Sequence, residues 1–240
     1  MRRARTIFLW LAAIALLGGG AFAFFWAIRQ TPEFYESVIR NEPAPEVRRD
    51  DAKVFVQRTL SLVEGMQHAD KWAEAFTQSQ INSWLSEELQ PKYGAFVPEG
   101  VSNPRVRLAD ETIEVGFRYK HEHWDSIVSV KTRPWVPKPN SLAFEIQSIR
   151  AGLIPIPLES IIQDLSKQFE VEGYRVEWSE ANGNDVVILH LTKSGDDQPV
   201  LESVKVVKGS ITVAGRRKNA RSVNATAERD TLIGAPVRIR

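Results

Sequence analysis

The sequence predicts an α+β protein in which an N-terminal transmembrane helix precedes a twisted, mainly antiparallel sheet with amphipathic helices packed on one face. Three observations predict this class: an uncharged apolar run near the N-terminus, several segments in which apolar and polar residues alternate, and segments with apolar residues at helical spacing. The 240 residues, 43% apolar and 25% charged, exclude global disorder and collagen-like repeats. The absence of cysteine excludes a disulfide scaffold, a thiolate metal site and a cysteine nucleophile.

Residues 6–28 form an uncharged, mostly apolar segment. A helix of this length reaches across a hydrocarbon core of ~30 Å. Three arginines precede the segment and only Arg29 follows it closely, so the charge bias keeps the N-terminus in the cytoplasm and exports the rest of the chain. We therefore expect residues 1–29 to be an anchor that contacts the lipid bilayer through residues 6–28, in a single-pass protein of a bacterial inner membrane with its main domain in the periplasm.

A cleaved signal peptide explains the same features. Residues 11–17 would form its apolar region and residues 21–23 its small-residue cleavage site. Apolar residues continue beyond that site through Phe24, Phe25 and Trp26, which favours a retained anchor. Both alternatives export the domain.

The residues that follow the anchor are predicted to be a linker and then a helix. Residues 30–49 contain three prolines among charged residues and read as a juxtamembrane linker. A helix opens at Asp50 and Asp51, whose charges suit the positive end of a helix dipole, and the exported α+β domain is expected to span residues 50–214. The apolar face of this helix is predicted to consist of Ala52, Val56, Leu60, Val63 and Met66.

A second soluble helix is predicted to begin at Thr77. The Thr77 hydroxyl can accept a hydrogen bond from a main-chain N–H while Gln80 reaches back to the start of the helix, which is a capping box. Pro91 is expected to end this helix. Its apolar stripe consists of Ile81, Trp84, Leu85 and Leu89.

From residue 103 onward the hydrophobic period changes to two, which predicts an antiparallel meander with one apolar and one polar face. A further amphipathic helix is predicted over residues 157–173. All strands are expected to join one long sheet. They are residues 105–108, 113–119, 126–133, 142–146, 174–179, 186–192, 201–207 and 210–214.

The formal net charge of +1 conceals a basic N-terminus, an acidic middle and a basic C-terminus. A near-neutral total gives no reason to expect nucleic acid as a partner. Residues 215–240 contain few large apolar residues and are predicted to be a disordered basic tail. The tail would either attract anionic lipid headgroups or remain solvated.

Patterns for catalysis and metal binding are weak. The sequence His121-Glu122-His123 would place two imidazoles on one face of a strand, but no third ligand accompanies them. The sequence contains no Gly-x-Ser-x-Gly and no His-Glu-x-x-His pattern. We therefore expect no enzyme activity, no catalytic residue, no metal site and no cofactor.

Two functional hypotheses differ in what covers the apolar face of the predicted sheet. Such a face must be buried on helices, on another sheet or on a ligand. An underfilled interior would bind lipid or another apolar ligand at the envelope, which we favour. A filled interior would make the domain a structural or assembly module for other envelope proteins. Trp124 and Trp135 are expected in the core, with a rim that contacts membrane or ligand as the alternative. The predicted ligand-lining residues are Ile81, Trp84, Leu85, Val115, Phe117, Val128, Phe144, Ile161 and Leu165.

The helix start at residues 77–85, Thr-Gln-Ser-Gln-Ile-Asn-Ser-Trp-Leu, is similar to that of bacterial membrane-anchored proteins of the YpmS-like family. The run Ala-Gly-Leu-Ile-Pro-Ile-Pro-Leu at residues 151–158 resembles the same sort of strand-to-helix junction. The resemblance covers residues 50–192 and implies an N-terminal span followed by an exported domain of strands and amphipathic helices. More distantly, the layout resembles tubular lipid-binding (TULIP-like) domains, which implies lipid binding and no catalytic residues.

Overall fold

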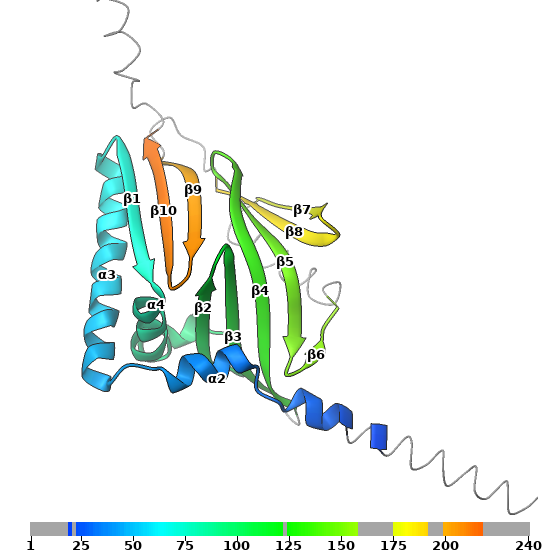
Figure 1. Ribbon diagram of the computed structural model, residues 1–240. Coiled ribbons are helices and arrows are strands. Elements are labelled where there is room, and N and C mark those ends of the chain that lie inside the picture. The colour runs from blue at the N-terminus through cyan, green and yellow to red at the C-terminus, as the bar shows by residue number, and fades with distance from the viewer. Residues whose placement is uncertain (1–18, 21–22, 122–123, 158–174, 192–198, 218–240) are drawn as a thin grey trace, which may run out of the picture.

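The computed structural model describes residues 19–20, 23–121, 124–157, 175–191 and 199–217 (Figure 1). Over these residues the protein is α+β, and each strand pairing is antiparallel, as the sequence predicts. Residues 23–28 are helical. The helices that follow are α2 (Glu33–Arg40), α3 (Pro45–His68), α4 (Gln78–Trp84) and α5 (Gln90–Tyr93), with a π-helical turn at Leu85–Leu89 and a 3₁₀ turn at Gly94–Phe96. The strands are β1 (Lys71–Thr77), β2 (Val101–Ala109), β3 (Thr112–His121), β4 (Trp124–Lys138), β5 (Ser141–Ala151), β6 (Ile154–Pro155), β7 (Arg175–Ala181), β8 (Asn184–His190), β9 (Pro199–Val207) and β10 (Ser210–Arg217).

The strands form two hydrogen-bonded sheets, not the single long sheet that the sequence predicts. The seven-stranded sheet has the order β2-β3-β4-β5-β8-β7, with β6 added to β5, and it contains the predicted meander. The three-stranded sheet has the order β1-β10-β9, so an early strand pairs with the last described one. Gly215 and Arg217, expected in the disordered tail, belong to β10, and Gly215 lies opposite Trp72 of β1.

The two sheets meet at the turns of the large sheet. The main-chain N–H of Asn140, between β4 and β5, donates to the Leu201 carbonyl of β9 at 3.0 Å. The Leu201 N–H donates in return to Asn140 Oδ1 at 2.7 Å. At the β2–β3 turn, the Glu111 N–H donates to the Val206 carbonyl at 3.1 Å. The small sheet is therefore fastened to the large one by main-chain hydrogen bonds.

Helix α3 lies beside β1 and begins at Pro45, five residues before the predicted start (Figure 1). Its contact face contains Ala52, which is 1% exposed, and Phe55, whose ring lies 5.2 Å from that of Phe76 in β1. The predicted apolar face is wrong for three of its members, because Phe55 and not its neighbours turns toward the aromatic side chains of β1 and α4. The three residues on the outer side are Val56, Leu60 and Val63, which are 38%, 64% and 45% exposed.

Helix α2 occupies part of the segment that the sequence predicts to be a linker. Its Phe34 and Tyr35 are buried against the large sheet. A Cβ atom on Gly116 of β3 would lie 2.7 Å from the Phe34 ring and 2.9 Å from the Tyr35 ring, so only glycine permits this approach. The Tyr35 hydroxyl donates to the Asn103 carbonyl at 2.7 Å. Residues 33–40 are therefore part of the packed domain, and α2 lies across the ends of β2 to β4 in Figure 1.

The capping box at the start of α4 is confirmed. Gln80 N–H donates to Thr77 Oγ1 at 3.2 Å, and Thr77 N–H donates to Gln80 Oε1 at 3.0 Å. The expected end at Pro91 is wrong, because the helical path continues through the π turn into α5, where Pro91 stands in the first turn. Proline is tolerated there because the first-turn N–H groups have no partner within the helix.

Several predicted elements fall mostly or wholly outside the described residues. They are the anchor before residue 19, the amphipathic helix from residue 158 to 173, and the tail from residue 218 onward. Within the part of the chain that the structure describes, no helix combines the length and the hydropathy needed to span a membrane.

Candidate functional site

The register of the large sheet gathers four predicted lining residues on one face. Phe117 of β3 lies directly opposite Val128 of β4. Val115 is two residues from Phe117 and therefore shares its face. Phe144 of β5 lies opposite Pro134, which is on the Val128 side of β4. The same face continues onto the last two strands, through the pairs Phe144–Val187, Leu142–Leu189, Trp178–Val187 and Val176–Leu189.

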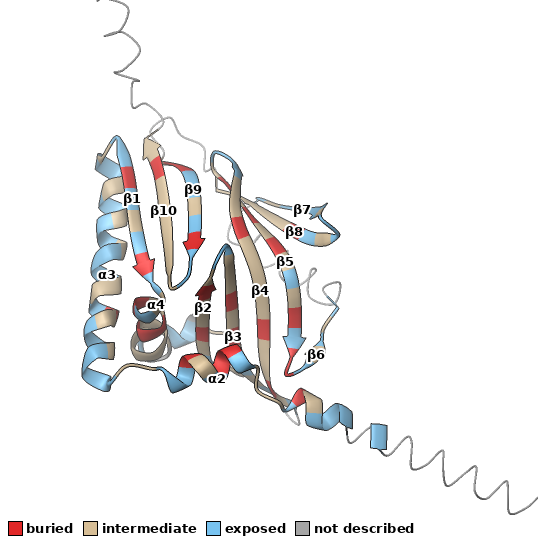
Figure 2. Cartoon of the chain, in the orientation of Figure 1, coloured by how far each residue is buried: buried red, intermediate tan, exposed pale blue. Residues whose placement is uncertain are grey.

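This apolar face is only half-buried along its centre. Val115, Phe117, Val128 and Phe144 are all of intermediate exposure, whereas Pro134, Ile149 and Ala151 on the same face are buried. On the opposite, polar face of these strands, the buried residues include Glu114, Ser129, Ala143 and Glu145. Figure 2 shows the resulting alternation along β3, β4 and β5. The polar face is therefore the more covered of the two, which is the reverse of what a one-sided sheet usually shows.

Three other predicted lining residues lie elsewhere. Ile81 and Trp84 belong to α4 and Leu85 to the π turn, and all three are half-buried. The Trp84 ring lies 5.3 Å from Phe55 of α3 and 5.9 Å from Tyr93 of α5. Trp84 thus forms part of a helical aromatic cluster and is not on the sheet face. The remaining predicted residues, Ile161 and Leu165, lie outside the described residues.

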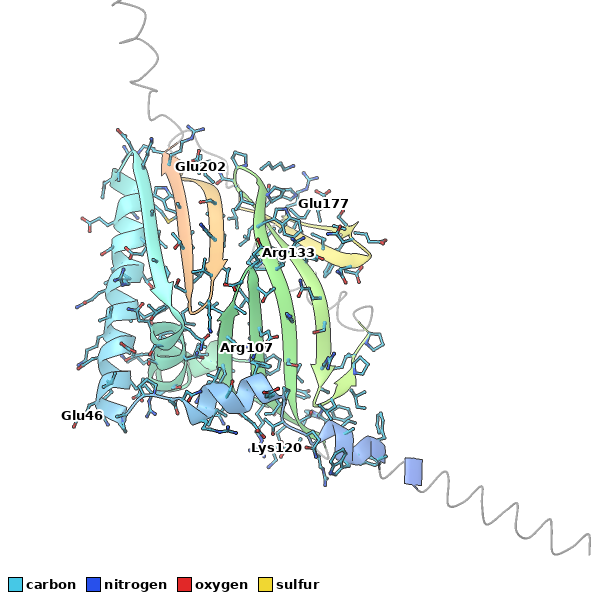
Figure 3. All side chains as sticks on the ribbon, in the orientation of Figure 1. Glu46, Arg107, Lys120, Arg133, Glu177 and Glu202 are labelled. Atoms are coloured by element: carbon cyan, nitrogen blue, oxygen red, sulfur yellow. The ribbon has the colours of Figure 1, made fainter. Side chains whose placement is uncertain are left out.

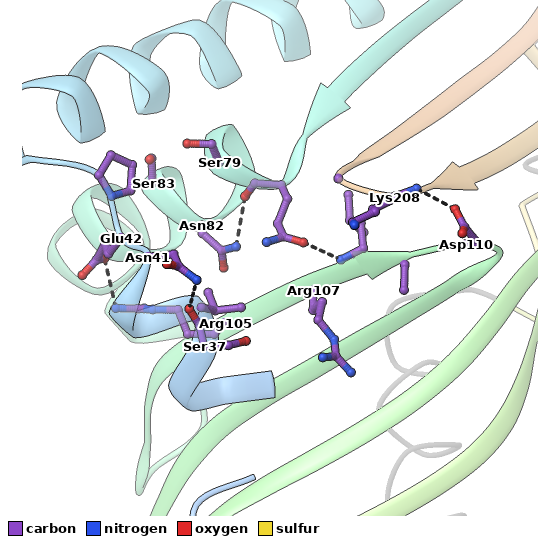
Figure 4. Close-up of a pocket in the computed structure, with 16 residues that line it drawn as sticks. Ser37, Asn41, Glu42, Ser79, Asn82, Ser83, Arg105, Arg107, Asp110 and Lys208 are labelled. Atoms are coloured by element: carbon purple, nitrogen blue, oxygen red, sulfur yellow. Dashed lines mark hydrogen bonds and ion pairs between the residues drawn. The ribbon is translucent and has the colours of Figure 1, made fainter. Parts of the chain in front are cut away.

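Beside β2, a cavity of about 570 Å³ lies between α2, α4 and the β9–β10 turn (Figure 4). Arg105, Arg107 and Lys208 line it, together with Glu42 and Asp110. Local sequence patterns do not predict this cavity, because its residues come from four separate segments.

Two side chains of α4 use their amides to complete the edge of β2. Asn82 Nδ2 donates to the Val106 carbonyl at 2.7 Å, and the Val106 N–H donates to Asn82 Oδ1 at 2.8 Å. The Leu108 N–H donates to Gln78 Oε1 at 2.8 Å. These amides therefore act as a substitute for a neighbouring strand, which explains why this part of the helix is polar.

The charges in the cavity are largely compensated within the protein. Arg105 is 8% exposed, and its Nη2 lies 3.3 Å from Glu42 Oε1. Glu42 also accepts a hydrogen bond from Ser86 Oγ at 3.1 Å and lies 3.5 Å from Arg48 Nη1. Burial raises the pKa of the nearby Tyr35 hydroxyl, and the Arg105 and Arg118 charges oppose this rise. The network joins the end of α2 to β2 and is a structural feature of the fold.

A serine, a histidine and a glutamate form a hydrogen-bonded chain that sequence spacing could not reveal. Ser141 Oγ lies 3.1 Å from His190 Nδ1, and His190 Nε2 lies 3.0 Å from Glu177 Oε2. A nucleophilic serine must reach its substrate, but Ser141 is 2% exposed. The chain of contacts therefore joins β5, β8 and β7 and offers no accessible nucleophile.

Glu145 is the other buried polar centre of the covered face. Its Oε2 accepts hydrogen bonds from Arg133 Nε at 2.8 Å and Nη2 at 2.6 Å, and its Oε1 accepts one from Asn184 Nδ2 at 2.8 Å. These bonds, the one from Asn184 first, hold the pKa of Glu145 below its ordinary value. The arrangement joins β4, β5 and β8.

Neither a metal site nor a similar known protein identifies a function for this chain. Among the described residues, no group of three histidine, cysteine or acidic side chains is placed to hold a metal ion. Of the predicted His121-Glu122-His123 pattern, only His121 is described, and it is exposed. The protein is therefore described as an α+β domain whose seven-stranded sheet has a half-covered apolar face. Comparison of the chain with protein-family models, curated proteins and solved structures gives no match.

Proposed function

We propose that this protein binds a lipid or another apolar ligand against the apolar face of the seven-stranded sheet. The observation that carries the proposal is the half-burial of Val115, Phe117, Val128 and Phe144 on one continuous face. A ligand that removes partly exposed apolar side chains from water stabilises the complex by about 0.8 kcal/mol per buried CH₂. All four side chains are uncharged and apolar, so they are compatible with an acyl chain.

The proposed setting is a cell envelope. The uncharged residues 6–28, with arginines before them, support a single-pass anchor whose N-terminus is cytoplasmic and whose main domain is exported from a bacterial inner membrane. The likeness of residues 77–85 to YpmS-like proteins, and of the layout to TULIP-like domains, supports the same setting. The proposed function is non-enzymatic and requires no cofactor.

A second candidate is an assembly module that binds another envelope protein. The outer side of α3 favours it, because Val56, Leu60 and Val63 form an exposed apolar stripe at helical spacing. Stripes of this kind commonly mark protein contacts. The two candidates use different surfaces, so one experiment can separate them.

The test places a photo-crosslinking benzoylphenylalanine in the full chain at position 117, in place of Phe117, and irradiates the membranes before purification. Lipid binding predicts adducts of lipid mass at this position. The matched control carries the same group at the exposed Arg118, whose side chain lies on the opposite face. Protein adducts at position 117, or lipid adducts of equal yield at both positions, would contradict the proposal. Protein adducts with the group at Leu60 would support the assembly module.

A further inference from the structure

One end of the molecule exposes a group of large apolar side chains. Phe24, Phe25 and Trp26 are 48%, 62% and 56% exposed. Trp124, the first residue of β4, is 40% exposed, and Leu153, in the turn between β5 and β6, is 47% exposed. Trp124 is thus not in the core, where the sequence analysis placed it.

Hydrogen bonds hold these three segments together. The Leu153 N–H donates to the Ala27 carbonyl at 3.0 Å. Ser126 Oγ, two residues after Trp124, donates to the Ile28 carbonyl at 2.7 Å. A Cβ on Gly152 would lie 2.3 Å from the Ile28 carbonyl oxygen, so this turn and residues 27–28 are in direct contact. Figure 3 shows Lys120 at this same end, beside the helix at residues 23–28.

Two cations at this end form no ion pair with a carboxylate of the described residues. Arg118 is paired with Asp125 through two hydrogen bonds of 2.8 and 2.6 Å. Arg29 and Lys120 are exposed and form no ion pair within the described part of the chain. Both lie close enough to Asp125 to lower the pKa of its carboxyl, after the larger effect of the Arg118 hydrogen bonds. The apolar side chains are therefore accompanied by free positive charge.

We propose that this end, consisting of residues 23–29, Lys120, Trp124 and Leu153, rests on an anionic lipid surface. Tryptophan favours the boundary between headgroups and acyl chains, and phenylalanine and leucine side chains bury at the same boundary. Each basic residue near such a surface adds about 1 kcal/mol of attraction. The inference rests on the proposed membrane attachment but not on the proposed ligand. In this orientation the C-terminal ends of β3 and β5 and the N-terminal end of β4 face the bilayer. The apolar face of the sheet is then next to the membrane from which a lipid ligand would come.

The absence of cysteine from the chain allows a clean test. The variants Trp124→Cys and Leu153→Cys each provide one site for an environment-sensitive fluorophore in the full chain. Leu60→Cys on α3 and Val207→Cys in β9 are matched controls, because both residues are apolar and exposed but lie on other elements. Each labelled chain is reconstituted into phosphatidylcholine vesicles with and without phosphatidylglycerol, some of which also carry a nitroxide-labelled lipid.

We expect the emission at positions 124 and 153 to shift to the blue and to be quenched by the nitroxide lipid, and both effects to increase with phosphatidylglycerol. Positions 60 and 207 should show neither effect. Replacing the free cations, by Arg29→Gln with Lys120→Gln, should remove the dependence on phosphatidylglycerol. Equal quenching at all four positions, or none at 124 and 153, would overturn the inference.

The outcomes remain separate from those of the proposed function. If the chain does not float with the vesicles, the membrane attachment fails and the inference fails with it. If the chain floats but position 124 is unquenched, the inference alone fails. Lipid adducts at position 117 in excess of those at position 118, which lies at the same end of β3, report the ligand separately from both.

Discussion

Glu145 remains ionised inside the fold because the protein replaces its water with donors. The side chain belongs to a residue that is 4% exposed, and three hydrogen bonds reach its two oxygens. A buried carboxylate is unfavourable unless it is paired and hydrogen-bonded in this way. The lowered pKa of Glu145 means that folding favours the charged form.

The lowered pKa of Glu145 determines how the stability of the protein depends on pH. A carboxyl whose pKa is lowered by folding stabilises the protein fully above its ordinary pKa of 4.5, and this contribution is lost as the pH falls through the folded-state value. We expect Glu145→Gln to lower the free energy of unfolding at neutral pH, and the difference from the unaltered protein to shrink below pH 4.5. Urea denaturation at a series of pH values measures this difference.

Glu202→Gln is the control for that measurement, because the Glu202 carboxylate pairs with Arg216 at 2.6 Å on the surface, where the two side chains are 44% and 41% exposed. Exposed pairs contribute little, so this variant should differ from the unaltered protein by only a few tenths of a kcal/mol. A Glu145→Gln difference that is the same at every pH would contradict the prediction.

Polar side chains of α4 act as a substitute for a strand at the edge of β2. Asn82→Ala removes both hydrogen bonds to Val106, and an unsatisfied buried main-chain group costs about 1–3 kcal/mol. We expect a loss of that size in the free energy of unfolding. Asn41→Ala is the matched control, since the amide of Asn41, the exposed residue that follows α2, donates to the Ser37 carbonyl of that helix in an exposed hydrogen bond. Equal losses in the two variants would show that the edge contacts are not special.

Local sequence patterns predicted the helices and strands better than they predicted which of these elements pack or pair with each other. The capping box and the meander depend on neighbouring residues, so both were predictable. The contact face of α3 was not, because Phe55 and Val56 both fit an apolar stripe and the choice depends on Phe76 of β1. The pairing of β1 with β10 joins segments that are far apart in sequence, and no local periodicity encodes it.

The candidate site was predictable only in part, for the same reason. Alternation in β3, β4 and β5 placed Val115, Phe117, Val128 and Phe144 on one face, as the register shows. Alternation could not reveal that α2 covers the polar face, because that contact depends on the missing side chain at Gly116. It also could not reveal the contacts of Ser141 with His190, which pairing between β5 and β8 creates.

Asn140 connects the two sheets of the protein. It adopts a left-handed conformation with φ of 59° and binds Leu201 through both its main-chain N–H and its side chain. We expect Asn140→Gly, which tolerates this conformation, to speed hydrogen exchange at the Leu201 amide and to lower the free energy of unfolding by about 1 kcal/mol. Asn140→Asp keeps the acceptor oxygen and should retain the protection of that amide. Loss of protection in both variants would place the stabilising contact elsewhere.

The amides of Asn82 and Gln78 have one more consequence. A bare outer strand invites pairing with a second chain, and repeated pairing of this kind builds fibrils. At β2, the Val106 N–H and carbonyl and the Leu108 N–H are already occupied from within. An incoming strand would have to displace α4 before it could add here. The polar helix therefore protects this border of the sheet against intermolecular growth.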